Sequence, residues 1–318
     1  MSVTLPISAL VATRDRYISL KTMLESLAQQ SVQPQEMIIV DGSDDNLTKK
    51  LCQSKIDGLN TTIFYHRAIE LGAATQRNLA MQYATQDTIW LLDDDITLEP
   101  HCLERIWQAL YGDPDLGGVN AMITNQKYLA PGRISRKLFQ LLHGKAESSY
   151  AGKCIGPALN LLPEDDPNLP EVVPVDWINS GCTLYRREAL PLPLFPDLFT
   201  GYSLMEDLCL SLTVGKKWQL ANVRTAKIYH DSQPGAHKSD RCVLAQMELV
   251  NRHYIMTHVL ERNTLKDYFK LSILQLFEIA ANLVSWRGWL VLPKVIWGKA
   301  KAIFIIAQAE YTTILTQK

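Results

Sequence analysis

The feature that most constrains the fold is a repeated alternation of short apolar runs and helix-like stretches over about the first 120 residues. A short apolar run bounded by polar turn residues predicts a buried strand. Strands are predicted by the runs 7–12, 37–40, 61–65, 88–92 and 118–123, and helices by the stretches 17–30, 72–83 and 100–110. Because strands that alternate with helices form mainly parallel sheets covered on both faces, the sequence predicts an α/β fold.

Acidic residues follow two of the predicted strands at the point where each strand ends. Asp41 closes the second run, and Asp93, Asp94 and Asp95 follow the fourth. In an open α/β sheet, ligands bind at the carboxyl ends of the strands. We therefore expect Asp41 and the acidic triplet to face one crevice, although they lie far apart in the sequence.

The regular alternation stops between about Asn125 and Pro174, where prolines and glycines recur along a long segment. This punctuation predicts an insertion or a mobile loop beside the site rather than a separate domain. Regular structure is predicted to resume at 175–185, and Glu206 and Asp207 stand at the start of a predicted helix.

The composition is that of a folded protein. Its 318 residues, of which 47% are hydrophobic, suffice for one large domain or for one domain with an appendage. The formal net charge of -1 provides no overall positive field, so nucleic acid is not an expected partner. The six cysteines form no CxxC pair, and the first apolar run lacks the basic flank and cleavage signature of a secretion signal. These features predict a cytoplasmic protein.

The region after about Leu265 is apolar and rich in Trp, but charges interrupt it before it reaches the roughly 20 residues that a spanning helix requires. Between Arg262 and Lys318 there are eight Lys or Arg and three Asp or Glu residues. This pattern is compatible with helices in a membrane interface, and equally with an amphipathic pair packed on the domain or on a second subunit. We predict a catalytic domain over residues 1–240 and a helical C-terminal extension over residues 241–318.

The acidic triplet is a candidate metal site. Three adjacent carboxylates repel one another, so a fold that gathers them usually supplies a cation. Mg²⁺ or Mn²⁺ would suit one or two carboxylates together with substrate phosphates. The alternative is a solvated turn in which an Asp or Thr97 caps the next helix.

Six sequence segments in order along the chain resemble one known family. They are VATRDR (11–16), IIVDGSDDN (38–46), LGAATQRNLA (71–80), WLLDDDI (90–96), INSGCTLYRREAL (178–190) and MEDLCLSL (205–212). Together they resemble the family 2 glycosyltransferases, and the tail is similar to that of members that build bacterial surface polysaccharides. The resemblance covers roughly residues 5–235 and implies a GT-A fold. It also implies inverting transfer of a sugar from a nucleotide sugar to an acceptor hydroxyl, in polysaccharide or glycolipid biosynthesis.

The resemblance assigns the nucleotide sugar to residues at strand mouths and at one helix start. Asp41 would accept hydrogen bonds from the nucleobase, and Arg77 would contact the base or the phosphates. Asp93 would face the ribose, and Asp95 would bind a metal that bridges the diphosphate, with Asp93 beside it. The residues expected to bind the nucleotide sugar are Ala12, Thr13, Arg16, Asp41, Arg77, Asn78, Asp93 and Asp94. A capping or surface role is the alternative for each.

The resemblance places Glu206 and Asp207 near the acceptor. Inversion needs one base to take the proton of the acceptor hydroxyl, and we expect Asp207 in that role with Glu206 second. The alternative is a charge pair that the dipole at a helix N-terminus favours. Asn179, Ser180 and Gly181 would form the acceptor-side wall.

His230 follows a predicted strand at a position where many members of the family have a metal-binding histidine. Because imidazole prefers softer metals than Mg²⁺, ligation by His230 would favour Mn²⁺. The alternative is a structural histidine. The expected cofactor is therefore a divalent metal, Mn²⁺ or Mg²⁺.

The expected donor is a UDP-, dTDP- or GDP-linked sugar, and the expected acceptor is a glycan or a lipid-linked sugar. A homodimer and peripheral contact with the cytoplasmic membrane face are both compatible with the tail. One alternative function is a nucleotidyltransferase, which usually has a loop rich in Gly and Lys where this chain has ATRDRY. The other is a non-catalytic protein that binds nucleotide sugars, which we would expect to lack the Glu206–Asp207 pair.

Overall fold

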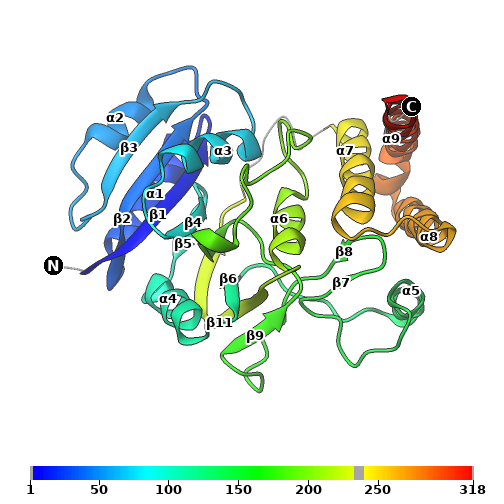
Figure 1. Ribbon diagram of the computed structural model, residues 1–318, viewed down its shortest axis with the longest axis horizontal. Coiled ribbons are helices and arrows are strands. Elements are labelled where there is room, and N and C mark those ends of the chain that lie inside the picture. The colour runs from blue at the N-terminus through cyan, green and yellow to red at the C-terminus, as the bar shows by residue number, and fades with distance from the viewer. Residues whose placement is uncertain (1–2, 233–239, 317–318) are drawn as a thin grey trace. The chain divides into compact units, whose positions relative to one another are not determined.

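The first half of the chain alternates strands and helices (Figure 1). The computed structural model describes residues 3–232 and 240–316, with side chains described up to residue 308. The elements of this half are β1 (Val3–Thr13), α1 (Tyr17–Ala28), β2 (Val32–Asp41), α2 (Leu47–Gln53), β3 (Thr62–Arg67), α3 (Ala73–Tyr83), β4 (Thr88–Asp93), β5 (Ile96–Leu98), α4 (Cys102–Gly112) and β6 (Leu116–Ile123). Each predicted strand and helix is confirmed, and α2 and β5 are additional.

The second half contains several short strands, the twelve-residue strand β11 and most of the longer helices. Its elements are α5 (Arg133–His143), β7 (Cys154–Ile155), β8 (Leu159–Asn160), β9 (Val172–Val175), β10 (Cys182–Arg186), η1 (Arg187–Ala189), α6 (Glu206–Val214), β11 (Gln219–His230), α7 (Arg241–Tyr254), η3 (Ile255–Val259), α8 (Leu265–Ala281), η4 (Asn282–Val284) and α9 (Trp286–Thr316). The helix predicted to begin at Glu206 is α6.

Nine of the described strands form one mixed sheet, in the order β3-β2-β1-β4-β10-β6-β11-β5, with β9 paired to β11. The pairs β1–β2, β1–β4, β2–β3 and β6–β11 are parallel. Strand β10 enters between β4 and β6 in the antiparallel sense. The predicted α/β fold with a mainly parallel, helix-flanked sheet is thus confirmed, and the antiparallel strands β10, β5 and β9 make it mixed.

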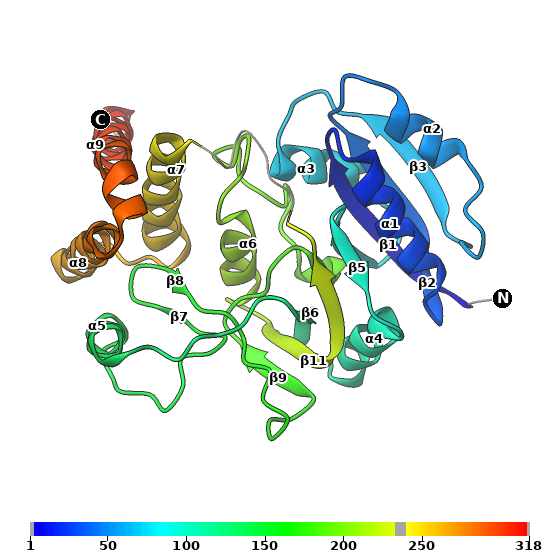
Figure 2. The same ribbon diagram turned by 180° about the vertical axis from the view of Figure 1, so that it is seen from behind.

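The central strands are buried on both faces, because helices cover the sheet on each side. Alternate residues of β1, among them Ile7 and Val11, pack with α1 and α4 in the main hydrophobic core. Helix α3 contacts β1 and β2 from the other face, as the two views of the fold show (Figures 1 and 2). Burial on both faces explains why the strands are continuous apolar runs rather than alternating ones.

The contacts divide the chain into two compact units. The first comprises Met1–Leu129, Ala151–Lys153 and Leu161–Gln233, and the second comprises Ala130–Tyr150, Cys154–Asn160 and Pro234–Lys318. The first unit contains the mixed sheet, and the second contains α5, α7, α8 and α9.

Parts of the irregular segment after residue 129 belong to the second unit through hydrogen bonds to its helices. The Lys270 ammonium donates to the carbonyl of Leu142 at 2.6 Å, and the Arg262 guanidinium donates to the carbonyl of Gly156. A Cβ at Gly156 would lie 2.8 Å from Cβ of Leu142, so the hairpin of β7 and β8 lies close to α5. This segment is therefore ordered by side chains more than a hundred residues further along the chain.

A buried cluster of charges joins α7, α8 and α9 within the second unit. Lys299 of α9 lies 3.1 Å from a carboxylate oxygen of Glu248 and 3.0 Å from one of Glu278. It also donates to the side chain of Gln275, while Arg252 pairs with Glu248. Burial would raise the pKa of Glu248, but Arg252 and Lys299 together bring it below its ordinary value. The cluster is internally neutralised, since two cations face two carboxylates.

Among the described residues, no helix is both long enough and apolar enough to cross a bilayer. The extended apolar segments of α8 and α9 are each interrupted by charged residues.

We expect Lys299→Met to lower the free energy of unfolding by about 3 kcal/mol, because it leaves two carboxylates in a buried site without their shared cation. Denaturant titration monitored by circular dichroism measures the change. Lys301→Met on the exposed part of the same helix is the matched control and should alter stability by less than about 0.5 kcal/mol. Equal effects of the two substitutions would show that the buried cluster does not stabilise the helices.

Candidate active site

The carboxyl ends of β1, β2 and β4 lie side by side at one edge of the sheet. Thr13 is the register partner of Asp41 on one side, and Ala12 is the register partner of Asp93 on the other. The predicted meeting of Asp41 and the acidic triplet at one sheet edge is therefore confirmed, with β1 between them.

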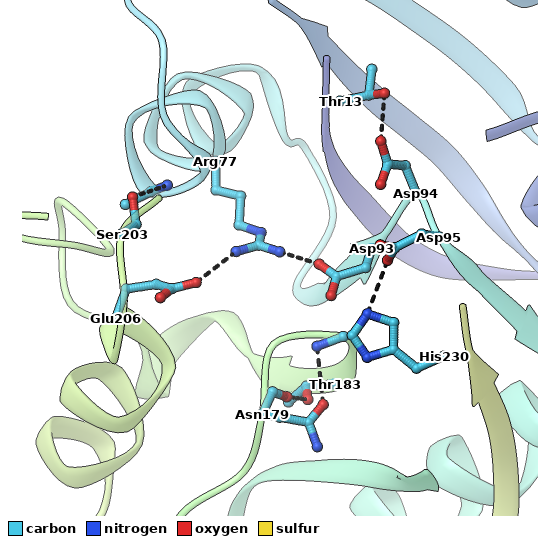
Figure 3. Close-up of polar contacts among 12 residues, drawn as sticks. Thr13, Arg77, Asp93, Asp94, Asp95, Asn179, Thr183, Ser203, Glu206 and His230 are labelled. Atoms are coloured by element: carbon cyan, nitrogen blue, oxygen red, sulfur yellow. Dashed lines mark hydrogen bonds and ion pairs between the residues drawn. The ribbon is translucent and has the colours of Figure 1, made fainter. Parts of the chain in front are cut away.

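Figure 3 shows Asp94 facing the hydroxyl of Thr13, Asp93 facing the guanidinium of Arg77 and Asp95 facing the imidazole of His230. Asp94 accepts a 2.6 Å hydrogen bond from Thr13 Oγ1, and Arg16 lies 3.2 Å from Asp94 and 3.0 Å from Asp95. Burial raises the pKa of Asp94 to about 7, although the Arg16 guanidinium acts in the opposite direction. Asp93 pairs with Arg77. The fold thus gathers negative charge at the end of β4 and supplies protein cations around it.

Asp93, Asp95 and His230 form a cluster that could hold a metal ion. One ligand atom of each lies within 4.8 Å of the others, and Nε2 of His230 is 3.0 Å from Oδ1 of Asp95. Two carboxylate oxygens and one imidazole nitrogen suit a divalent ion of Mn²⁺ character.

Strand pairing brings His230 to this position. Strand β5 runs antiparallel to β11 with Ile96 opposite His230, and Asp95 immediately precedes Ile96. The N–H of Asp231 donates to the carbonyl of Asp95 at 2.8 Å and holds the two segments together. The histidine is thus placed beside the triplet by a three-residue strand that the sequence pattern does not predict.

Arg77 links the acidic triplet to the start of α6. Its side chain is 4% exposed, and its guanidinium pairs with Asp93 and lies 3.2 Å from Oε1 of Glu206. Burial would lower the pKa of Arg77, but Asp93 and Glu206 raise it, so the side chain is a permanent cation. The resemblance implied contact with the base or the phosphates, whereas the described contacts of Arg77 are with these two carboxylates.

Glu206 and Asp207 form the first turn of α6, after Met205 in a left-handed conformation with φ of 71°. Burial raises the pKa of both carboxyls above their ordinary values, and repulsion from Asp207 raises that of Glu206 further. Arg77 acts against both shifts. An Asp207 carboxylate with a raised pKa is a stronger proton acceptor than an exposed one.

Asn179, Ser180 and Gly181 adjoin Asp93. The carbonyl of Gly181 accepts the N–H of Asp93 at 2.9 Å, and Gly181 donates to Oδ1 of Asn179 at 3.1 Å. A Cβ at Gly181 would lie only 3.3 Å from Oδ2 of Asp93, so a larger residue would press on that carboxylate. Ser180 is buried in the same turn.

Asp41 is fully buried and has partners that the sequence analysis missed. Its carboxylate accepts from the N–H of Ser43 at 2.9 Å and from the hydroxyl of Tyr65 at 3.0 Å, and Arg67 lies 3.7 Å away. Arg67 is the register partner of Asp41 on β3. Extending the predicted strand at 61–65 by two residues would have placed Arg67 at the same sheet edge.

Two other predicted residues have mainly structural contacts. The amide of Asn78 donates to the carbonyl of Phe195 at 2.8 Å and accepts its N–H at 3.0 Å. Ala12 contributes backbone within β1. The neighbouring Gln76, which the sequence analysis did not select, donates to the carbonyls of Thr13 and Val40 and ties α3 to the sheet edge.

Comparison with known proteins assigns the chain to a family. The profile described as glycosyl transferase family 2 matches residues 8–190, which is more than half of the chain. The chain belongs to glycosyl transferase family 2. The matched range includes the carboxyl-terminal part of β1, all of β2 and β4, and the whole acidic triplet, and the resemblance stated from the six segments is confirmed.

One characterised relative of this family 2 member is the glucosyl-dolichyl phosphate glucuronosyltransferase of Haloferax volcanii. The two are 25% identical over 120 residues, which are 37% of this chain and 38% of the relative. The match therefore spans well under half the length of that relative.

Two solved structures share the fold of this family 2 member. A mannosyltransferase from Pyrobaculum calidifontis, solved with GDP-Man and Mn²⁺, is 14% identical with a TM-score of 0.56, over 94% of this chain and 87% of that one. GalNAc-T7, solved with UDP, GalNAc and Mn²⁺, is 14% identical with a TM-score of 0.52, over 78% of this chain and 49% of that one. These similarities confirm the GT-A fold.

We expect Asn78→Ala to lower the free energy of unfolding by about 1–3 kcal/mol, because both backbone groups of Phe195 lose their side-chain partner. Thermal and denaturant unfolding measure the loss. Asn78→Asp keeps the acceptor but not the donor and should have an intermediate effect. A variant as stable as the natural protein but with weakened nucleotide-sugar binding would instead place Asn78 at the donor.

Proposed function

We propose that this protein is an inverting glycosyltransferase that moves a sugar from a nucleotide-sugar donor to an acceptor hydroxyl. The observation that carries the proposal is that Arg77 pairs both with Asp93, in the candidate metal cluster, and with Glu206, beside the candidate base. Asp93 belongs to the cluster with Asp95 and His230, and Glu206 begins the helix that presents Asp207. In this proposal the donor and the base would meet at one edge of the sheet.

Asp95, Asp93 and His230 would hold a divalent metal, because their ligand atoms already lie within 4.8 Å of one another. When bound, such an ion supplies positive charge that neutralises the leaving nucleoside diphosphate, so that no general acid is required. The two structures of the same fold, described above, were solved with Mn²⁺. Together with the imidazole ligand, this favours Mn²⁺ over Mg²⁺.

In this proposal, residues at the carboxyl ends of the strands form the rest of the donor site. Asp41 would receive the nucleobase beside β1, with its carboxylate oriented by Ser43 and Tyr65. Arg16 stands between Asp94 and Asp95 and would carry positive charge toward the diphosphate. Similarity to proteins solved with UDP and with GDP-Man supports a nucleotide-sugar donor.

Asp207 would remove the proton from the acceptor hydroxyl as its oxygen attacks the anomeric carbon. The bond from that carbon to the diphosphate breaks on the opposite side, which inverts the configuration. Burial keeps the pKa of Asp207 above that of an exposed aspartate, which strengthens it as a base. Glu206 is engaged with Arg77 at 3.2 Å, so we assign it to positioning.

The acceptor in this proposal is a glycan or a lipid-linked sugar that enters past Asn179, Ser180 and Gly181. The name of the Haloferax volcanii relative, glucosyl-dolichyl phosphate glucuronosyltransferase, describes a lipid-linked sugar substrate, which supports this class. A role in polysaccharide or glycolipid assembly follows from the same reasoning. Family membership favours sugar transfer over the nucleotidyltransferase alternative.

A direct assay tests the proposed function. The purified protein is incubated with Mn²⁺ and a panel of UDP-, dTDP- and GDP-linked sugars, and release of nucleoside diphosphate is recorded with glycan and lipid-linked acceptors. Nuclear magnetic resonance of the product reads the anomeric configuration. Retention of configuration would refute inversion, and binding of donor without transfer to any acceptor would favour the non-catalytic alternative.

Asp95→Ala should abolish Mn²⁺-dependent binding of the donor and leave the fold intact, because it removes one ligand from the cluster. Isothermal titration of the donor with and without Mn²⁺ measures the effect, and circular dichroism reports the fold. Asp57→Ala, at an exposed aspartate far from the triplet in the sequence, is the control. Unchanged metal-dependent binding in the Asp95 variant would contradict the metal assignment.

Asp207→Asn should retain donor and metal binding but slow transfer by at least roughly a hundredfold, the usual effect of losing a general base. Turnover is measured at saturating donor, beside donor affinity. Glu206→Gln keeps a hydrogen-bond acceptor for Arg77 and should slow transfer less. Near-normal turnover of the Asp207 variant, together with a large loss in the Glu206 variant, would exchange the two roles.

A further inference from the structure

Helix α9 has two apolar faces, and among its described side chains only one of these faces is packed. On the packed face, a Cβ added at Gly298 would lie 2.2 Å from the carbonyl oxygen of Cys242, so α9 and α7 are in close contact. Ala302 on the same side is fully buried, and Lys299 is held by the charged cluster described above. Figure 1 shows α9 beside α7 and α8 in the yellow-to-red group of helices.

The opposite face carries large apolar side chains that remain exposed. Trp286, Trp297 and Phe304 are 77%, 62% and 63% exposed, and they lie about three and then about two helical turns apart on one side of α9. Leu290, 62% exposed, lies between the two tryptophans on the same side. An apolar strip of this length on a folded unit marks an interaction surface.

A row of basic residues borders this strip. Arg287, Lys294 and Lys301 recur at intervals of seven residues, so they fall along one flank of the strip, and all three are exposed. The Lys301 ammonium lies 5.7 Å from the centre of the Trp297 ring. From Trp286 to Gln308 the sequence contains no acidic residue, and the one other cation in this stretch, Lys299, is neutralised inside. The exposed face is therefore both apolar and positively charged.

We propose that the face of α9 formed by Trp286, Leu290, Trp297 and Phe304, with its basic row, docks this protein on an anionic lipid surface. Tryptophan and aliphatic side chains enter the headgroup region of a bilayer, and Lys and Arg beside them pair with anionic headgroups. The helix lies along the surface rather than across the bilayer, consistent with the result that no described helix can span one.

The positive charge of this face favours an anionic lipid surface over a second copy of the chain as its binding partner. In a symmetric dimer through this face, each subunit would present the same three cations to the other, without a carboxylate on the same stretch of α9 to receive them. An anionic membrane offers the opposite charge over the whole length of the strip. The inference goes beyond the proposed sugar transfer and does not depend on it, because docking requires neither donor nor acceptor.

The test is co-flotation of the full-length protein with vesicles of phosphatidylcholine alone or mixed with an equal amount of phosphatidylglycerol. The natural protein should float with the anionic vesicles and far less with the neutral ones, and high salt should only partly release it. Trp286→Ser/Trp297→Ser/Phe304→Ser should reduce binding by about tenfold or more. Arg287→Gln/Lys294→Gln/Lys301→Gln should reduce it by about tenfold or more on anionic vesicles only.

Matched triple variants elsewhere on the chain are the controls. Ile18→Ser/Leu129→Ser/Leu192→Ser removes equally exposed apolar side chains, and Lys49→Gln/Lys50→Gln/Lys55→Gln removes three exposed cations. Both controls should bind vesicles as the natural protein does, and thermal unfolding should show that all variants are folded. The charge variant keeps the test valid if the apolar variant does not fold.

Two results would overturn the proposal. One is the absence of an effect of α9 on vesicle binding: the natural protein does not bind anionic vesicles, or the α9 variants bind them as well as the controls do. The other is sedimentation that shows a dimer which the α9 variants dissociate, without vesicle binding, since the face would then be a subunit interface. Donor binding and transfer are measured on the same samples, so a failure of docking is distinguished from a failure of the proposed enzyme.

Discussion

The structure of the candidate site depends on the compensation of buried negative charge at the carboxyl edge of the sheet. Asp94 and Asp95 are almost completely buried next to Asp93, and unpaired carboxylates in such a place would be strongly destabilising. Arg16 pairs with Asp94 and Asp95, and Arg77 pairs with Asp93, so two protein cations compensate the three carboxylates. The positions of Arg16 and Arg77 therefore set the orientation of the three carboxylates.

Arg77 has the larger structural consequence, because it contacts elements from distant parts of the sequence. Its partners Asp93 and Glu206 end β4 and begin α6, and it is nearly inaccessible to solvent between them. A charged hydrogen bond in a buried setting is strong and directional, so it determines the orientation of both carboxylates. A side chain that was expected to touch substrate thus joins Asp93 of the proposed metal cluster to Glu206, the neighbour of the proposed base Asp207.

The second unit also compensates buried carboxylates with buried cations, and there the pairs join its helices. There Lys299 and Arg252 neutralise Glu248 and Glu278 in the interior and hold α9 against its neighbours. The cations on the exposed side of α9, Arg287, Lys294 and Lys301, lie outside this buried cluster. Helix α9 therefore has a buried, paired charge on one face and an exposed basic row on the other.

The α/β class, the order of the first strands and helices, and the acidic strand ends can be read from the sequence, because they are encoded in runs of consecutive residues. It also predicted α6 and, through the resemblance, the membership of Asp95, Asp207 and His230 in one site. Which groups meet cannot be read from the sequence, since Arg77 and Glu206 are 129 residues apart and no local pattern predicts their contact. The short strand β5 brings His230 to Asp95, and the packing of α9 decides which of its two apolar faces is exposed. These contacts and exposures depend on strand pairing and packing between segments that are distant in the sequence. The residues of one segment do not specify which other segment it will contact.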